Sequence, residues 1–187
     1  MSTEDNARVF YESARSELIE RIGHRDNVLI LYLGGVGALY GVALGTTASL
    51  RVLLAIPYLA LGAATILSQH HAIIGQIGYY LATELHPFFE SKSSSDCCPP
   101  QWDTSKSMDS YHHKAMDQRF LGHLLLIVVP AVSALMFTNT LTLQSWTPEN
   151  VLWWTGAAFT ALSAWVVVAA HYWRKSLQKK KTNAEQH

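Results

Sequence analysis

Apolar residues along this chain gather in four long stretches that polar segments separate. The stretches cover residues 28–44, 52–67 with an apolar tail beyond, 120–143 and 151–173, and none contains Asp, Glu, Lys or Arg. About 20 apolar residues in a helix cross the roughly 30 Å hydrocarbon layer of a membrane. In lipid, helices and closed barrels alone satisfy their own backbone hydrogen bonds. The pattern therefore predicts an all-α, polytopic membrane protein with four transmembrane helices, at about residues 28–48, 52–72, 121–143 and 151–173.

The second stretch continues as a helical pattern beyond the membrane. A helix that begins near residue 52 crosses the lipid with about 20 residues, so it leaves near His70 and His71. Residues 72–85 keep apolar positions at helical spacing, and Pro87 supplies a stop. We therefore expect one helix of about 30 residues or more that runs on into water, although Gly75 and Gly78 allow a bend.

The N-terminal segment, residues 1–27, predicts an amphipathic helix that precedes the first span. Its apolar residues recur every four positions, at Phe10, Ala14, Leu18 and Ile22. Glu17 and Arg21 form a helix-supporting i,i+4 pair. The polar face is mixed in charge, which favours docking on the extension of the second helix over lying on lipid. A second helix, residues 104–119, is expected to run straight into the third span.

Basic residues set the expected orientation in the membrane. Four spans place the N-terminus, the connection 73–120 and the tail 174–187 on one side, and Arg51 alone of the 14 Lys and Arg lies on the other. Cytoplasmic segments carry the excess of Lys and Arg. We therefore expect a multi-pass protein of the cell membrane, a bacterial inner membrane, with both termini in the cytoplasm. The basic tail is expected to contact anionic lipid rather than nucleic acid.

Glycines form a ladder along the first span. They lie at Gly34, Gly37, Gly41 and Gly45. Small residues at this spacing let another helix approach closely, and close packing drives helix association in lipid. Two interpretations follow from the ladder. One is contact with the second span, which is equally small at Ala60, Gly62, Ala63 and Ala64; the other is a contact between subunits of a homo-oligomer.

Other features of the spans indicate scaffolding. Pro130 interrupts the third span and predicts either a packing kink or a gate. Thr147 and Pro148 are typical of a helix start. Aromatic residues at the ends of the fourth span are typical of interface anchors, namely Trp146, Trp153, Trp154, Tyr172 and Trp173.

The sequence has few residues in patterns that are typical of proton exchange, redox or metal sites. The spans lack the acidic or lysine residues that a proton-coupled exchanger ordinarily needs. Cys97 and Cys98 are adjacent, unlike the spaced pair of a thiol oxidoreductase. Histidines gather near the inner surface, at His70, His71, His86, His112, His113, His123 and His171. Adjacent histidines on a helix point about 100° apart, unlike an i,i+4 ligand pair. We therefore expect no enzyme activity, no metal and no cofactor.

The segment SKSSSDCCPPQWDTSKSMDS, residues 91–110, is rich in Ser, Pro and Asp and predicts an exposed loop. Loops of this kind serve as connectors or as partner contacts. The residues predicted to meet a cytoplasmic protein partner are Phe10, Leu18, Ile22, Tyr80 and Trp102.

The helix RVFYESARSELIERIGHRD, the four uncharged spans and the middle loop together resemble small membrane proteins of bacterial anti-phage loci. These include four-span accessory proteins beside RNA-targeting CRISPR nucleases. The resemblance covers nearly the whole chain and rests on architecture, so it carries no functional residue across. It implies an oligomeric membrane effector or sensor that is controlled from the cytoplasm.

Three functions follow from these patterns. The first is a non-enzymatic homo-oligomer whose cytoplasmic helices receive a signal and alter membrane permeability in antiviral defence. The second is a metal- or haem-dependent membrane enzyme that uses the inner histidines. The third is a small channel or transporter, with Gln69, His70 and His71 at its inner mouth and Pro130 as a gate.

Overall fold

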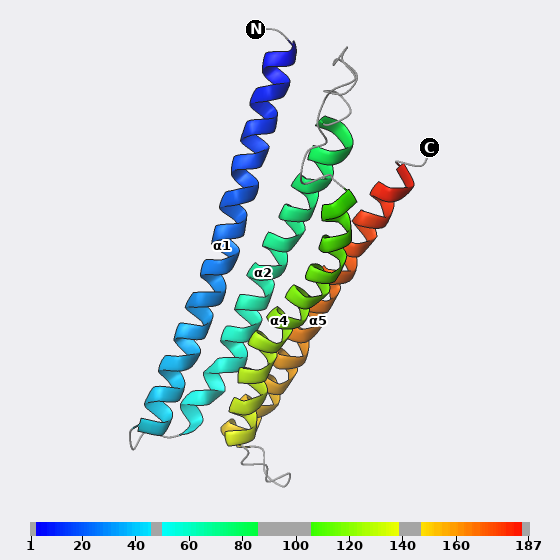
Figure 1. Cartoon of the computed structure of the whole chain (residues 1–187). Coiled ribbons are helices and arrows are strands. Elements are labelled where there is room, and N and C mark those ends of the chain that lie inside the picture. The colour runs from blue at the N-terminus through cyan, green and yellow to red at the C-terminus, as the bar shows by residue number, and fades with distance from the viewer. Residues whose placement is uncertain (1–2, 46–49, 86–105, 139–146, 185–187) are drawn as a thin grey trace.

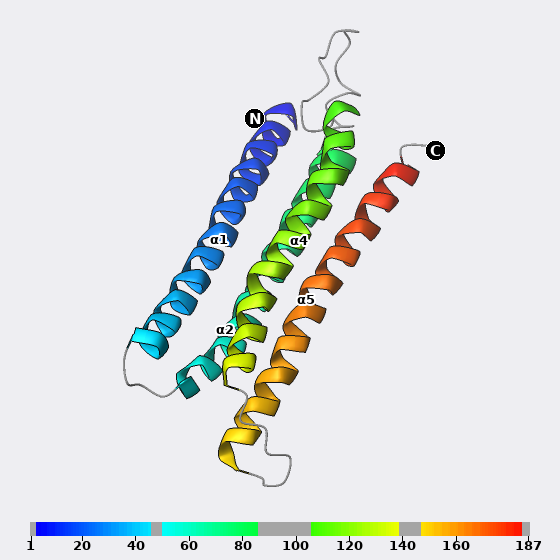
Figure 2. The ribbon, with the colours of Figure 1, turned by 60° about the horizontal axis from the view of Figure 1, so that its bottom comes forward.

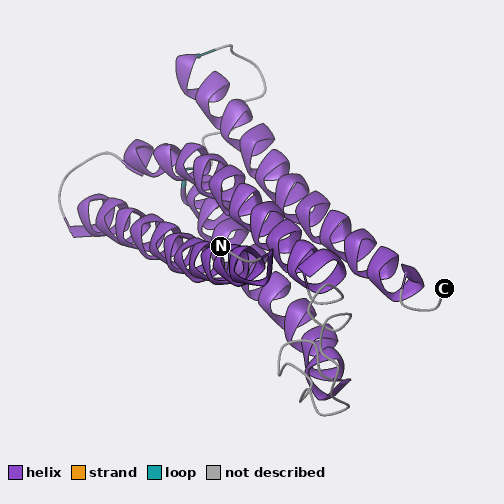
Figure 3. Cartoon of the chain, turned by 90° about the horizontal axis from the view of Figure 1, so that it is seen from above, coloured by secondary structure: helices purple, strands orange, loops and turns teal. Residues whose placement is uncertain are grey.

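The computed structural model describes residues 3–45, 50–85, 106–138 and 147–184 (Figure 1). In chain order the elements are α1 (Thr3–Gly45), the 3₁₀ turn η1 (Leu50–Leu54), α2 (Ala55–Tyr80), the π turn η2 (Leu81–Leu85), α4 (Lys106–Phe137) and α5 (Pro148–Ala184). These described ranges contain no strand, and the view from above shows the chain as packed helices (Figure 3).

Four helices are long and apolar enough to cross a membrane. The candidate spans are Asp5–Gly45, Leu50–Leu85, Gln118–Phe137 and Pro148–Trp173. This finding confirms the predicted all-helical fold with four apolar helices. Helices α1 and α5 form the two edges of the bundle, and the start of α1 and the end of α5 lie at one end of it, called the terminal end below (Figures 1 and 2).

Helix α1 unites two predicted elements. The expected N-terminal helix and the first span form one helix of 43 residues. Its buried residues are Ala7, Leu29, Tyr32, Val36 and Ala43. Alternating steps of three and four residues keep such a stripe on one side, whereas a strict four-residue repeat drifts by about 40° per step. For this reason Phe10, part of the predicted four-residue repeat, lies outside the stripe and is 59% exposed.

Helix α2 runs past His71, as the sequence predicts. It is helical to Tyr80 and continues without a break as η2 to Leu85. The extension buries Ile74, Leu81 and Leu85, and η2 contacts α1. The extension therefore has the apolar partner that its pattern requires, and the N-terminal half of α1 supplies it.

The core lies around α2, which contacts each of the other three long helices. Its inward face is small, with Ala60 and Ala64 fully buried. On α5, a Cβ added at Gly156 would lie 3.3 Å from Leu135 Cδ2 and 3.4 Å from Pro57 Cγ. Close packing of small residues therefore joins α2, α4 and α5.

Side-chain hydrogen bonds add to this packing. The Tyr32 hydroxyl donates to the Ile127 carbonyl at 3.0 Å, and the Tyr40 hydroxyl donates to the Pro130 carbonyl at 3.3 Å. Both bonds tie α1 to α4. The indole of Trp153, predicted as an interface anchor, donates to a carbonyl of α4 at 3.0 Å. This tryptophan therefore also joins α5 to α4.

A helix cap and an ion pair lie at the end of the bundle opposite the terminal end. Thr147 caps α5, because its hydroxyl accepts the backbone N–H of Asn150 at 3.3 Å, which confirms the predicted helix start. Helix α4 ends at Phe137, and residues 139–143 of the predicted third span lie outside the described residues. Arg51 pairs with Glu149 at 2.8 Å and so links η1 to α5.

Candidate functional site

The glycine ladder of α1 faces away from the bundle. A Cβ built at Gly34, Gly37, Gly41 or Gly45 meets nothing within 4 Å. These four residues, called the glycine face below, are all exposed. Gly35 is different, because a Cβ there would lie 3.8 Å from Leu59 Cδ1 on α2. The ladder therefore does not make the contact with the second span that was one of its two interpretations.

Most of the small residues of α2 are buried in the core and do not face the glycine face of α1. Ala60, Ala63 and Ala64 are buried in the core, whereas Gly62 is exposed and has open space around it. The close approach of α1 to α2 instead uses the stripe that includes Tyr32 and Val36. The glycine face is consequently left as a flat, open surface along the apolar half of α1.

Side chains beside the glycine face are large and apolar. Ile30, Leu31, Val42 and Leu44 are all exposed. They lie on or beside the side of α1 that carries the glycine face, so this side of the helix is apolar and open. Such a surface allows two helix backbones to approach closely in a membrane.

Histidines form a layer toward the terminal end of the bundle. The rings of His24 and His70 stack across α1 and α2 with centroids 6.2 Å apart, and those of His71 and His123 meet across α2 and α4 at 5.2 Å. His171 of α5 is buried and stacks on a phenylalanine of α4 at 4.2 Å. The layer therefore joins all four helices in neighbouring pairs.

An arginine follows His24 in this layer. Arg25 has a side chain only 12% exposed and donates from Nη2 to Asp26 Oδ1 at 2.7 Å. The Nδ1 atoms of His70 and His123 are buried, and no described residue forms a hydrogen bond with them. Within the described ranges, no group of three or more His, Cys, Asp or Glu is placed to hold a metal ion. The layer is thus a set of paired rings between helices, without the convergence that a metal site requires.

Three residues predicted for an inner mouth are consecutive in α2. Gln69 is exposed, whereas His70 and His71 are half-buried and face different neighbours. Pro130 lies seven residues beyond His123 on α4, about 10 Å along the helix. Its carbonyl accepts the Ser133 hydroxyl at 2.9 Å, and the Tyr40 hydroxyl lies 2.5 Å from Ser133 Oγ and 3.3 Å from the same carbonyl. These bonds place Pro130 within the packing of α1 against α4.

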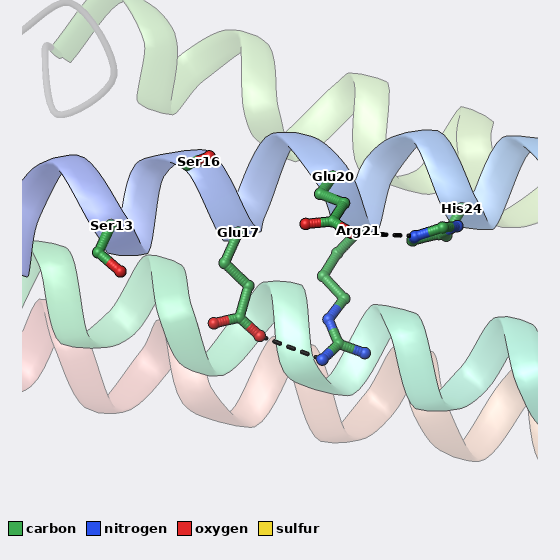
Figure 4. A pocket seen from close by; sticks show the side chains of 6 residues that line it. All are labelled: Ser13, Ser16, Glu17, Glu20, Arg21 and His24. Carbon is green, nitrogen blue, oxygen red and sulfur yellow. Dashed lines mark hydrogen bonds and ion pairs between the residues drawn. The ribbon is translucent and has the colours of Figure 1, made fainter.

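A polar groove of about 540 Å³ follows the N-terminal half of α1 (Figure 4). It is lined by Ser13, Ser16, Glu17, Glu20, Arg21 and His24. Arg21 pairs with Glu17 at 3.1 Å, which confirms the predicted i,i+4 pair, and His24 approaches Glu20 at 3.3 Å (Figure 4). The groove therefore carries paired charges of both signs.

The predicted partner contacts occupy different surroundings. Phe10 is exposed, while Leu18, Ile22 and Tyr80 are half-buried near the packing of α1 on the extension of α2. Trp102 lies outside the described residues, as do Cys97, Cys98 and His86. His112 and His113 fall within α4.

Two features of the structure were missed from the sequence. The hydroxyls of Tyr32 and Tyr40 bind α4, a role that their spacing of eight residues on one helix face could have suggested. Trp165 is exposed in the middle of the fourth apolar helix. The sequence did contain a signal for this feature. Trp165 lies far from either predicted membrane interface, whereas tryptophan ordinarily concentrates at the interfaces.

No protein-family model matches this chain, and neither a curated protein nor a solved structure shows significant similarity to it.

Proposed function

We propose that this protein is an oligomeric integral membrane protein that acts as an effector or sensor under cytoplasmic control. The observation that carries the proposal is the open glycine face of α1, formed by Gly34, Gly37, Gly41 and Gly45. Among the described residues of one chain, nothing packs against this face. In a membrane a second helix can approach it closely and gain van der Waals contact that lipid tails provide less well.

The length of the helices supports control from the cytoplasm. Helices α1, α2 and α5 each continue past the apolar region toward the terminal end. In the proposed orientation this end is cytoplasmic, in agreement with the distribution of Lys and Arg. The extension of α2 packs on α1 through η2. A partner that displaces this pair would therefore move helices that cross the bilayer.

The response that we propose is a change in membrane permeability after assembly, in the inner membrane of a bacterium during antiviral defence. The hypothesis of a defence role rests on the architecture alone. Phage challenge of cells with and without the intact gene tests it directly, since a defence protein must lower plaque numbers only when it is present.

The experiment that tests assembly compares two leucine substitutions in open space. Gly41→Leu places a large side chain on the glycine face, and Gly62→Leu places the same side chain on the exposed surface of α2. Neither Cβ meets another atom within 4 Å, so both variants are expected to fold. We expect cross-linking in membranes to show loss of the oligomer for Gly41→Leu and an unchanged oligomer for Gly62→Leu.

Activity is measured on the same variants as dye release from cells or vesicles. The proposal requires that Gly41→Leu lose dye release together with assembly. If Gly41→Leu retained both assembly and dye release, the glycine face would have no role in either, and the proposal would have to be abandoned.

A further inference from the structure

Contacts across the bundle show which residues of neighbouring helices lie at the same height. The Ser68 hydroxyl of α2 donates to the Val166 carbonyl of α5 at 3.4 Å. The rings of His24 and His70 stack across α1 and α2. Helix α1 runs in the opposite direction to α2 and α5 (Figure 1). Trp165 therefore lies at about the height at which the charged part of α1 ends and its apolar part begins.

Polar side chains are exposed at this height on the helices that neighbour α5 and α2. On α1 these are Asp26, whose side chain is 52% exposed, and Asn27. On α2 Gln69 is exposed, and on α5 Trp165 is 65% exposed. The surface of α1 therefore changes from polar to apolar at the height of Gln69 and Trp165, which is called the boundary level below.

The ion pair of Arg51 with Glu149 marks the other limit of the apolar zone. From Arg51 to Gln69 the helix rises by about 29 Å, and from Glu149 to Trp165 it rises by about 24 Å. The hydrocarbon layer of a membrane is roughly 30 Å thick, and local thinning of the bilayer accommodates a somewhat shorter apolar length. The zone between this ion pair and the boundary level can therefore hold the hydrocarbon layer.

The apolar stretch of α5 alone places the lipid surface at Trp173 instead, about 12 Å beyond Trp165. Lipid that reached this height would cover the exposed side chains of His24 and Asp26 on α1. Pairing with Arg25 does not shield Asp26 from its surroundings, and charged side chains that face hydrocarbon are rare because they are costly to remove from water. The heights of the charged residues therefore favour a lipid surface at the boundary level.

We propose that α5 leaves the hydrocarbon at Trp165 and that the indole of Trp165 binds the headgroup region of the lipid nearer the terminal end. Tryptophan prefers this region because its ring contacts apolar chains while its N–H finds polar partners. Residues 166–173 continue α5 beyond the hydrocarbon, where Val167 and His171 are buried against the other helices. This inference rests on the proposed function, because it assumes an integral membrane protein.

The histidine layer then stands outside the hydrocarbon. His70 and His71 directly follow Gln69 at the boundary level, and the ring of His123 meets that of His71. The sequence alone places His123 inside the third span. A partner that approaches the terminal end would therefore meet a layer to which all four long helices contribute, rather than α1 and the extension of α2 alone.

Cysteine labelling in open membrane fragments tests the position of the lipid surface, in a full-length chain with Cys97→Ser and Cys98→Ser. Ala161→Cys and Ala169→Cys are a matched pair, because each lies four residues from Trp165, one toward each end of α5. A maleimide reacts with the thiolate, which forms in water and not in hydrocarbon. We expect a water-soluble maleimide to label Ala169→Cys and to leave Ala161→Cys unlabelled, although Ala161 is the more exposed of the two in the bundle.

Unfolding in dodecyl sulfate should make both variants react fully, which controls for the reagent. If Ala169→Cys stayed unlabelled in the membrane, the lipid surface would lie further along α5 and the inference would be overturned, with the proposed function intact. Equal labelling of both variants would place this part of α5 in water and would remove the proposed membrane protein as well.

Fluorescence quenching identifies what covers Trp165. The emission of the native chain minus that of Trp165→Phe isolates this indole, and the exposed position should tolerate the change. Both proteins are placed in phosphatidylcholine vesicles that carry bromine either near the headgroup or near the end of the acyl chain. We expect stronger quenching of Trp165 by the bromine near the headgroup. Stronger quenching by the deep bromine would overturn the inference, and so would quenching by neither, which would show that protein such as a second copy covers the indole.

Discussion

Tyr32 provides a direct test of how α1 is held to the rest of the bundle. Its hydroxyl is buried and donates to the Ile127 carbonyl of α4 at 3.0 Å. Tyr32→Phe removes this one bond and keeps the ring in place. Hydrogen bonds between membrane helices contribute about 0.6 kcal/mol on average and up to about 1.7 kcal/mol. Loss of the bond should therefore raise the unfolding equilibrium constant about 3- to 16-fold.

The assay is unfolding of the purified protein in mixed micelles by increasing fractions of a denaturing detergent. Tyr172→Phe is the matched control, because Tyr172 is exposed on α5 and should tolerate the same change. Tyr40→Phe should add a separate loss, since its site lies two helical turns from Tyr32 and contacts a different carbonyl. Equal stability of Tyr32→Phe and the Tyr172→Phe control would refute the interhelical bond as a source of stability.

Two further predictions concern packing and charge. Gly156→Leu should destabilise the bundle, because even a Cβ at this position lies 3.4 Å from Pro57 Cγ, whereas Gly41→Leu should leave thermal unfolding of the detergent-solubilised monomer unchanged; equal melting temperatures of the two variants would contradict the packing described. Arg51→Ala should cost about 1 kcal/mol or less, because the pair with Glu149 is largely exposed, and the loss should shrink at high salt; a salt-independent loss would argue against this ion pair as its cause.

Apolar patterning was sufficient to predict the helical fold. Long stretches without charge predicted four helices that could cross a membrane, and the spacing over residues 72–85 predicted the extension of α2. Transfer of the apolar side chains out of water dominates the free energy of folding of these segments, whatever their neighbours are. For this reason the pattern predicts the helices well. The prediction that α1 is two elements differed from the structure because no residue between 23 and 28 interrupts helical geometry.

The direction in which each helix faces was harder to predict. The glycine ladder was compatible with contact inside the chain or between chains, because close packing has the same small-residue pattern in both cases. The buried stripe of α1, which includes Tyr32 and Val36, determines the direction in which the helix faces. Predicting this stripe requires the positions of α2 and α4. Gly156, the glycine that does pack closely inside the chain, stands alone in its helix and has no repeat to reveal it.

Native mass spectrometry of the gently extracted protein tests the central claim most directly. The account predicts a discrete homo-oligomer for the native chain and for Gly62→Leu, and a monomer for Gly41→Leu, because the glycine face is open in the single chain. A monomeric native protein, or an oligomer that Gly41→Leu leaves unchanged, would contradict the claim that this face assembles the protein.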